Sequence, residues 1–70
     1  GSLAYFRFYE DEKFFIALNF SKKEKKIHIN ERGQWRVMLS THRSNREHLT
    51  NLSLTLAPYE ATVIMKIGEL

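Results

Sequence analysis

Residues 14–20 read Phe-Phe-Ile-Ala-Leu-Asn-Phe, and this stretch decides the fold. In a β-strand it places its even-numbered residues on one face and its odd-numbered residues on the other. Both faces are then mostly apolar, which predicts a central strand with neighbours on both sides. The longest unbroken apolar run, Phe14–Leu18, is far shorter than the roughly 18 to 20 residues that cross a bilayer.

The same period of two recurs before and after this stretch. Strands are predicted at Leu3–Tyr9, Phe14–Phe20, Lys26–Asn30, Gln34–Ser40, Leu52–Leu56 and Ala61–Ile67. The turns between them include Glu10–Lys13, a positive-φ turn at Gly33, and Ala57–Glu60 with Pro58 at its second position. Residues 41–50 lack periodic apolar content and are predicted to form a loop. The sequence therefore predicts an all-β, antiparallel, Greek-key-like β-sandwich of about six to eight short strands.

Aromatic side chains divide into two groups by their phase along these strands. A core-facing position is expected for Phe6, Phe8, Phe14, Phe20 and Trp35. Tyr5, Tyr9 and Phe15 are out of phase, and Arg7 lies between the two tyrosines. These four residues predict an apolar outer patch, which on a small soluble domain indicates a contact surface. A second-face core and a ligand platform are the alternatives.

Length and composition limit the chain to one small globular domain. Seventy residues without cysteine cannot hold a second domain or a disulfide framework. Gly1–Ser2 resembles the remnant of a cleaved expression tag, so residues 3–70 are expected to form a single domain. The net charge is +3, and its clearest basic cluster, residues 22–26, is expected to form a solvated turn. With no cysteine and no signal segment in view, a cytoplasmic location is favoured.

The sequence predicts no catalytic group, no metal site and no cofactor. The acidic residues lie in predicted turns or in the long loop and are expected to be solvated. Ser40, Ser44, His42 and Glu47 are close in sequence, but no strained nucleophile turn presents a serine. His42 and His48 lie in an irregular loop with no metal-binding spacing, and no glycine-rich phosphate loop occurs.

Four segments in order carry a family resemblance. They are Leu3–Tyr9, Phe14–Ser21 (FFIALNFS), Trp35–Thr41 (WRVMLST) and Leu54–Ile64 (LTLAPYEATVI). Together they resemble the C-terminal domain of the alpha-amylase family of glycoside hydrolases, which includes alpha-glucosidases, maltogenic amylases and trehalose-forming relatives. The resemblance implies a non-catalytic accessory sandwich that packs on the catalytic (β/α)8 barrel of the same polypeptide. The catalytic carboxylates of the parent glycoside hydrolase would then lie in the barrel.

The leading hypothesis is therefore a C-terminal accessory domain, residues 3–70, that stabilises the barrel, with contact to α-glucan as a further option. Its interdomain surface is predicted at Tyr5, Arg7, Tyr9 and Phe15. Neither nucleic acid nor membrane is an expected partner.

Two alternatives remain open at this stage. The pI near 9.5 and the aromatics beside Arg7 would suit a small β-barrel that binds single-stranded nucleic acid. A carbohydrate-binding module would stack Trp35 or Tyr59 on a sugar ring. Within the fold, Asn19 is expected to tie a strand end by its amide, and Pro58 to set the last turn.

Overall fold

The computed structural model describes residues 1–45, 47–50 and 53–69 of the chain. Within these residues seven strands form two antiparallel sheets, which confirms the predicted sandwich. They are β1 (Ser2–Tyr9), β2 (Glu12–Asn19), β3 (Lys25–His28), β4 (Gln34–Ser40), β5 (His48–Leu49), β6 (Ser53–Leu56) and β7 (Ala61–Gly68). None of the described residues belongs to a helix that could cross a membrane.

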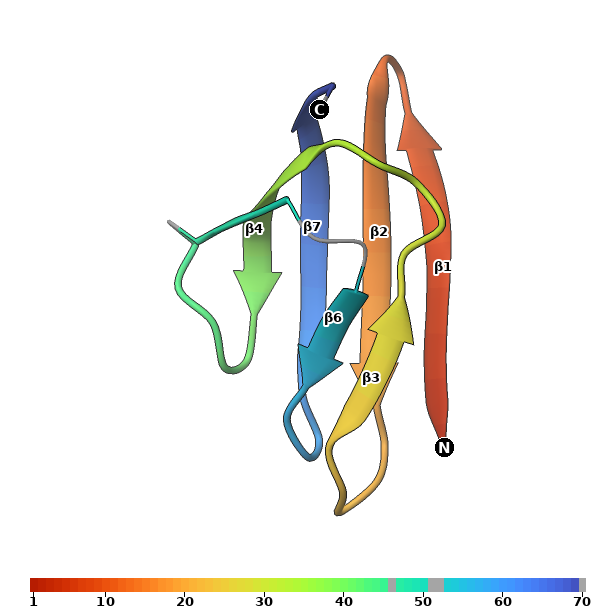
Figure 1. Ribbon diagram of the computed structural model, residues 1–70, viewed down its shortest axis with the longest axis vertical. Coiled ribbons are helices and arrows are strands. Elements are labelled where there is room, and N and C mark those ends of the chain that lie inside the picture. The colour runs from red at the N-terminus through yellow and green to blue at the C-terminus, as the bar shows by residue number, and fades with distance from the viewer. Residues whose placement is uncertain (46, 51–52, 70) are drawn as a thin grey trace.

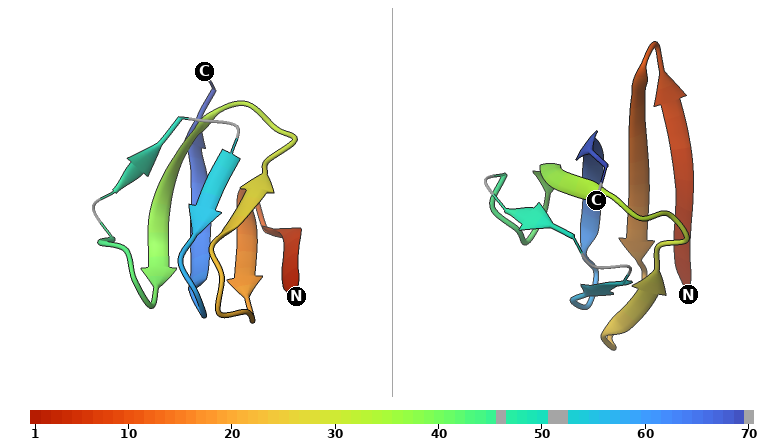
Figure 2. Two further views of the ribbon diagram at one scale, coloured as in Figure 1. Left: turned by 60° about the horizontal axis from the view of Figure 1, so that its bottom comes forward. Right: turned by 45° about the horizontal axis from the view of Figure 1, so that its top comes forward.

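The two sheets differ greatly in size. The larger sheet has the order β1-β2-β7-β4-β5, and the smaller sheet consists of β3 and β6 alone. Figure 1 shows β3 and β6 in front of the larger sheet, and the two views of Figure 2 show the same two layers from other directions. β2 lies between β1 and β7, as its two apolar faces predict.

The hydrophobic core lies between the two layers. Phe6 on β1 packs against it, with its ring centroid 5.0 Å from that of Phe15 and 6.3 Å from that of Trp35. Full burial of one large apolar side chain contributes about 1.5–3 kcal/mol, so each large member of this cluster stabilises the fold substantially. Its buried members are Phe15, Ala17, Ile29, Trp35, Val37, Leu54, Leu56 and Ile64.

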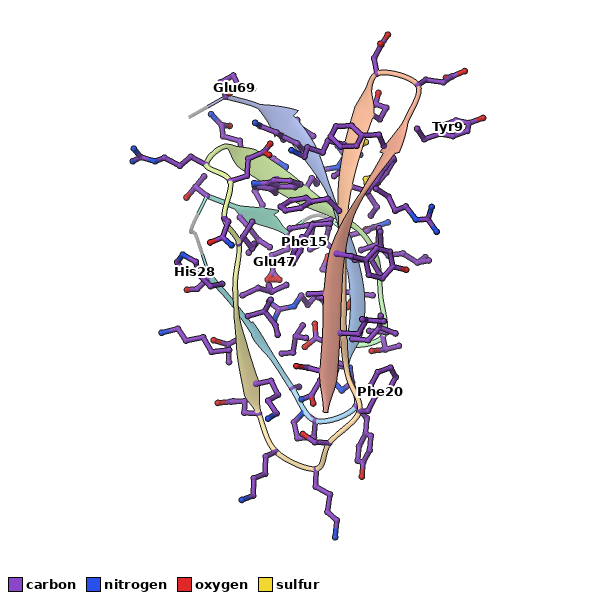
Figure 3. All side chains as sticks on the ribbon, turned by 90° about the vertical axis from the view of Figure 1, so that its right-hand side faces the viewer. Tyr9, Phe15, Phe20, His28, Glu47 and Glu69 are labelled. Atoms are coloured by element: carbon purple, nitrogen blue, oxygen red, sulfur yellow. The ribbon has the colours of Figure 1, made fainter. Side chains whose placement is uncertain are left out.

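The structure corrects which face of β2 is buried. Phe15 is 4% exposed and points toward the smaller sheet, whereas Phe14 is only half-buried and Phe20 is 59% exposed on the opposite side (Figure 3). Phe8, also expected in the core, lies beyond it and is exposed. Alternation locates a strand but cannot choose between two apolar faces. Here the inner face is the odd-numbered one, which also carries the buried amide of Asn19.

The β1–β2 turn is tighter than predicted. Tyr9 pairs directly with Glu12, so the connection is only Glu10–Asp11, with Glu10 at a φ of 56°. Glu12 and Lys13 belong to β2 although both are charged, because their backbone pairs with Tyr9 and Phe8 of β1.

Residues 41–50 are not a continuous loop. His48–Leu49 forms β5, which pairs with Trp35 and Arg36 at the edge of the larger sheet. A strand of two residues is too short to show alternation, so the sequence pattern missed it. Leu52, predicted to open the following strand, lies outside the described residues.

Gly33 turns the chain into β4 with a φ of 153°, which confirms the predicted positive φ. The backbone there is also closely packed. A Cβ added at Gly33 would lie 2.6 Å from Lys66 Cε and 3.0 Å from the carbonyl oxygen of Gly68.

We therefore expect Gly33→Ala to lower the free energy of unfolding by about 1–3 kcal/mol, because a side chain is strained in this backbone conformation. Urea denaturation followed by circular dichroism measures the loss. Gly68→Ala is the matched control, since nothing lies within 4 Å of its added Cβ. Equal losses in the two variants would contradict the explanation.

Candidate functional site

The side of the larger sheet that faces away from β3 and β6 is apolar. Figure 3 shows Tyr9 and Phe20 on this side, opposite Phe15. Leu39, at 71%, and Leu3, at 50%, are among its most exposed side chains. We call this surface the outer face, and its apolar members are Leu3, Tyr5, Tyr9, Phe14, Ile16, Leu18, Phe20, Leu39, Val63, Met65 and Ile67.

Strand register assembles the outer face. Leu3 pairs with Leu18, and Tyr5 pairs with Ile16 across β1 and β2. Ile16 in turn pairs with Val63 on β7. Cross-strand neighbours of this kind lie close enough to pack, so three strands contribute one continuous apolar surface.

Charged residues lie around this apolar surface. Glu12 is opposite Tyr9 near the hairpin, and Arg36 on β4 is opposite Met65. The Arg7 guanidinium lies 5.8 Å from the centroid of the Tyr5 ring. An apolar centre with a polar rim is the usual composition of a protein contact surface.

The structure brings together three of the four residues predicted for the interdomain surface. Tyr5, Arg7 and Tyr9 occupy alternate positions of β1 and all lie on the outer face. Phe15 does not join them, because it is a core residue on the opposite side of the sheet. Its assignment to an exposed patch was wrong.

The two residues predicted for sugar stacking have different environments. Trp35 is 0% exposed and packs in the core, which corrects its assignment as a stacking residue. Its indole N–H has no hydrogen-bond partner among the described residues. Tyr59 is 61% exposed and has a φ of 58° in the turn before β7.

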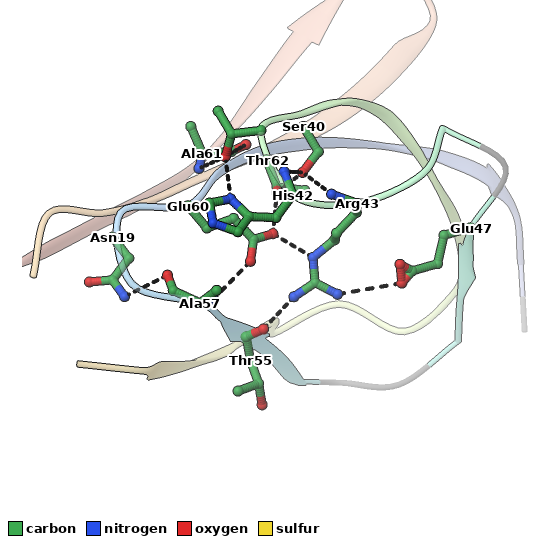
Figure 4. A network of polar contacts seen from close by, with 11 residues as sticks. Asn19, Ser40, His42, Arg43, Glu47, Thr55, Ala57, Glu60, Ala61 and Thr62 are labelled. Carbon is green, nitrogen blue, oxygen red and sulfur yellow. Dashed lines mark hydrogen bonds and ion pairs between the residues drawn. The ribbon is translucent and has the colours of Figure 1, made fainter. Parts of the chain in front are cut away.

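A buried carboxylate, Glu60, lies where three connections meet at one end of the sandwich (Figure 4). Its side chain is 2% exposed, which corrects the expectation that all acidic residues are solvated. It accepts hydrogen bonds from Arg43 Nε at 2.5 Å, Thr62 Oγ1 at 2.5 Å and the Ala57 amide at 2.8 Å. Arg43 also donates to the carbonyl oxygen of Thr55 on β6.

The hydrogen bonds decide the ionisation of Glu60. Burial raises the pKa of its carboxyl, but the bonds from Thr62, the Ala57 amide and Arg43 outweigh that effect and leave the pKa below 4.5. The group is therefore a carboxylate at neutral pH. A buried charge with this many donors is compensated rather than isolated.

Asn19 ties the end of β2 by its amide, as predicted, and bonds to two connections. Its amide nitrogen donates to the carbonyl oxygens of Lys23, at 2.8 Å, and Ala57, at 3.0 Å. Its amide oxygen accepts from the backbone N–H of Ser21. The last turn is also formed as expected, since the Glu60 N–H donates to the Ala57 carbonyl across Pro58.

A second ionic cluster fixes the β3–β4 connection at the other end. Glu31 pairs with Lys13 on β2 and with Lys66 on β7, the latter at 2.9 Å. Hydrogen bonds from Lys13 and Lys66 lower the pKa of Glu31. Hydrogen bonds to Glu31 and Glu69 raise the pKa of Lys66.

The residues weighed for catalysis have structural roles here. Ser40 Oγ accepts the backbone N–H groups of His42 and Arg43 and lies 2.7 Å from Thr62 Oγ1. His42 Nδ1 lies 2.7 Å from the hydroxyl of Thr41. Within the described residues, no pocket is found and no group of three metal-ligating side chains gathers.

The sequence did not reveal the pairing of Arg43 with Glu60. The two residues are 17 positions apart and lie in different connections, so no local pattern links them. One local feature could have indicated that Glu60 is buried. It follows Pro58 by two residues and directly precedes an alternating strand. An acidic side chain at this position can accept a hydrogen bond from the Ala57 amide.

We expect Glu60→Ala to cost about 3 kcal/mol or more, because it leaves the Arg43 guanidinium half-buried and without its main partner. Glu47→Ala is the matched control, since its ion pair with Arg43 is 3.5 Å long and should contribute less than about 1 kcal/mol. Urea denaturation of both variants gives the comparison. Losses of equal size would refute the central role of Glu60.

Stability should fall as the pH drops below 4.5, the ordinary value for these carboxyls. Glu31 and Glu60 have lowered pKa values in the fold, so their contribution is present above 4.5 and is lost as the pH falls through the lowered values. Urea midpoints measured across this range test the effect. Glu31→Gln and Glu60→Gln should each flatten the decline, and an unchanged slope in both would contradict it.

Comparison with known proteins identifies a family that matches this chain. The comparison with curated proteins gives no match. The family described as "Maltogenic Amylase, C-terminal domain" matches residues 1–63, which is most of the chain. This agrees with the family resemblance of the four sequence segments and with the all-β fold. The chain therefore belongs to the family of maltogenic amylase C-terminal domains.

Proposed function

We propose that this domain is non-catalytic and stabilises the catalytic (β/α)8 barrel of its parent enzyme by packing its outer face against it. The observation that carries the proposal is the outer face itself, which exposes large apolar side chains across several strands of one sheet. Membership of a family of amylase C-terminal domains supports a barrel of the same polypeptide as the partner.

The energetics favour a covered outer face. Tyr5 remains 38% exposed and Leu39 71% exposed, although both lie on a sheet whose other side is already packed. Burial of such a side chain against a partner contributes about 1.5–3 kcal/mol when it is complete. Several of them together can offset the entropy lost when two domains become fixed relative to each other.

The polar rim would set the orientation of the contact. Arg7, Arg36 and Glu12 lie beside the apolar centre, so partner groups of opposite charge could pair with them. Charges at the rim of an interface favour one relative orientation of the two domains more than they raise the affinity between them.

We also propose that the domain contacts α-glucan through Tyr59. This phenol ring is exposed on the turn between β6 and β7, and an exposed aromatic ring can stack on a sugar. Titration with a soluble α-glucan while the Tyr59 ring resonances are followed by NMR tests the contact. The absence of saturable shifts would remove the glucan role and leave the scaffold role intact.

The non-catalytic part of the proposal has a direct assay. Incubation of the chain with maltooligosaccharides should release no reducing ends beyond the buffer control. Hydrolysis that copurifies with the folded domain would reject the proposal.

We expect Tyr5→Ser combined with Leu39→Ser to destabilise the full-length parent enzyme by at least about 2 kcal/mol more than the isolated chain, because only the parent would lose buried contacts. Thermal denaturation of both proteins gives the two differences. Tyr59→Ser is the matched control, as it removes an exposed aromatic ring from the turn between β6 and β7 and not from a strand of the larger sheet. Equal losses in parent and isolated chain would rule out the docking role.

A further inference from the structure

Two arginines lie at the ends of one row of side chains that crosses the outer face. Arg7 on β1 pairs with Phe14 on β2, and Phe14 pairs with Met65 on β7. Met65 in turn pairs with Arg36 on β4. Figure 1 shows these four strands side by side. Adjacent strands are about 4.8 Å apart, so three spacings separate the backbones of the two arginines by about 14 Å.

The row next to this one contains no charged residue. It crosses the same four strands, so the two rows together make an apolar strip with one arginine on each side. Both arginines are exposed. The members of the uncharged row are Tyr5, Ile16, Val63 and Leu39.

Neither arginine has an oppositely charged partner in the described part of the chain. None of the ion pairs found there includes Arg7 or Arg36. Arg7 contacts the ring of Tyr5, and Arg36 lies opposite His48 on β5. Glu12 is the acidic residue of the described strands that shares this face, and it pairs with neither arginine. Both guanidinium groups are therefore available to an acceptor on a partner.

The type of cation also distinguishes this face from the smaller sheet. The described strand positions of the outer face include Arg7 and Arg36 but no lysine. The exposed basic residues in and before β3 are Lys22, Lys23 and Lys26. Protein interfaces are enriched in arginine and depleted of lysine, because a guanidinium is planar, more weakly hydrated and able to bind a carboxylate with two hydrogen bonds. This composition indicates that the arginines belong to a protein contact.

The proposed burial of the outer face places a condition on its partner. A guanidinium that loses water without gaining an acceptor opposes association. Carboxylates are the acceptors that match its geometry best. Because no acidic group of the described residues pairs with Arg7 or Arg36, the partner surface has to supply these acceptors.

We propose that the barrel surface that covers the outer face carries two carboxylates, one paired with Arg7 and one with Arg36, on opposite sides of an apolar centre. This inference rests on the proposed docking and names the chemistry of the partner surface. A single ion pair would leave the domain free to turn about that contact. Two pairs on opposite sides of the apolar strip fix the rotation, so these arginines set the orientation of the domain.

Zero-length crosslinking of the full-length parent enzyme tests the inference. A carbodiimide joins an amine to a carboxylate only where the two groups touch, and it does not join arginine. Arg7→Lys and Arg36→Lys keep the charge and introduce an amine at each position. Each variant should yield a peptide that joins the substituted position to an Asp or Glu of the barrel. Mass spectrometry identifies these peptides, and the wild type should lack both.

Two controls accompany the crosslinking. Arg32→Lys introduces an amine at an exposed position of the β3–β4 connection, outside the strands of the larger sheet, and should give no link to the barrel. Lys66 and Glu31 are 2.9 Å apart within the domain, so they should be linked in every variant, which shows that the reagent has reacted.

Charge reversal gives an independent measurement. The Arg36 side chain has no ion pair to lose among the described residues, so Arg36→Glu should leave the thermal midpoint of the isolated chain nearly unchanged. The same variant should lower the midpoint of the parent enzyme by about 4 °C or more, because the parent loses an ion pair and gains a repulsion. Arg36→Lys should restore most of the loss. Arg32→Glu is the matched control and should not lower the midpoint of the parent more than that of the isolated chain.

The outcomes separate this inference from the docking on which it rests. If Tyr5→Ser with Leu39→Ser destabilises the parent more than the isolated chain but neither arginine-to-lysine variant links to the barrel, the docking stands and the carboxylate pairing is wrong. A link from only one of the two positions also contradicts the inference, which requires both. Links to Glu12, to a segment outside the barrel or to another copy of the enzyme would assign the arginines to a different partner. If the apolar variant has equal effects in both proteins, the docking itself fails.

Discussion

The buried ion pair of Glu60 and Arg43 is the interaction on which the rest of the structure depends. It joins the β4–β5 connection, the β6–β7 turn and the backbone of β6 in one compensated network. A core this small gives limited stability to a domain of seventy residues. Polar contacts that fix where the connections cross therefore decide which of several apolar packings the chain adopts. Removal of one partner would leave a charge that the core cannot solvate.

The unequal size of the two sheets explains the outer face. β3 and β6 cover only part of one side of the larger sheet, and none of the described strands forms a layer on the other side. A strand such as β2 that is apolar on both faces is expected where both sides are covered. The larger sheet thus has apolar side chains on both faces, as a fully buried sheet does, but the described strands of the domain cover only one of these faces. A parent enzyme that provides the second layer would account for the pattern.

Alternation predicted six of the seven described strands, because each is long enough to show a period of two. It could not choose the inner face of β2, since Phe14 and Phe15 are equally apolar and only tertiary packing distinguishes them. The role of Pro58 and the bonds of Asn19 to Ser21 and Lys23 were predictable because they lie within a few residues, whereas the bond of Asn19 to Ala57 spans 38 positions. The Arg43–Glu60 pair was missed because it depends on two connections meeting in space. Local sequence specifies strands and turns, whereas the contacts between connections come from the assembled sandwich.

Asn19 joins the two connections that cross between the layers at one end of the sandwich, by bonds to Lys23 and Ala57. At the opposite end the polar contacts of the β3–β4 connection are ion pairs of Glu31 with flexible lysine side chains. Fixed amide bonds resist separation more than partly solvated ion pairs do. Thermal fluctuations should therefore part the layers first at the Glu31 end, with the Asn19 end as the hinge, and the earliest step of unfolding is directional.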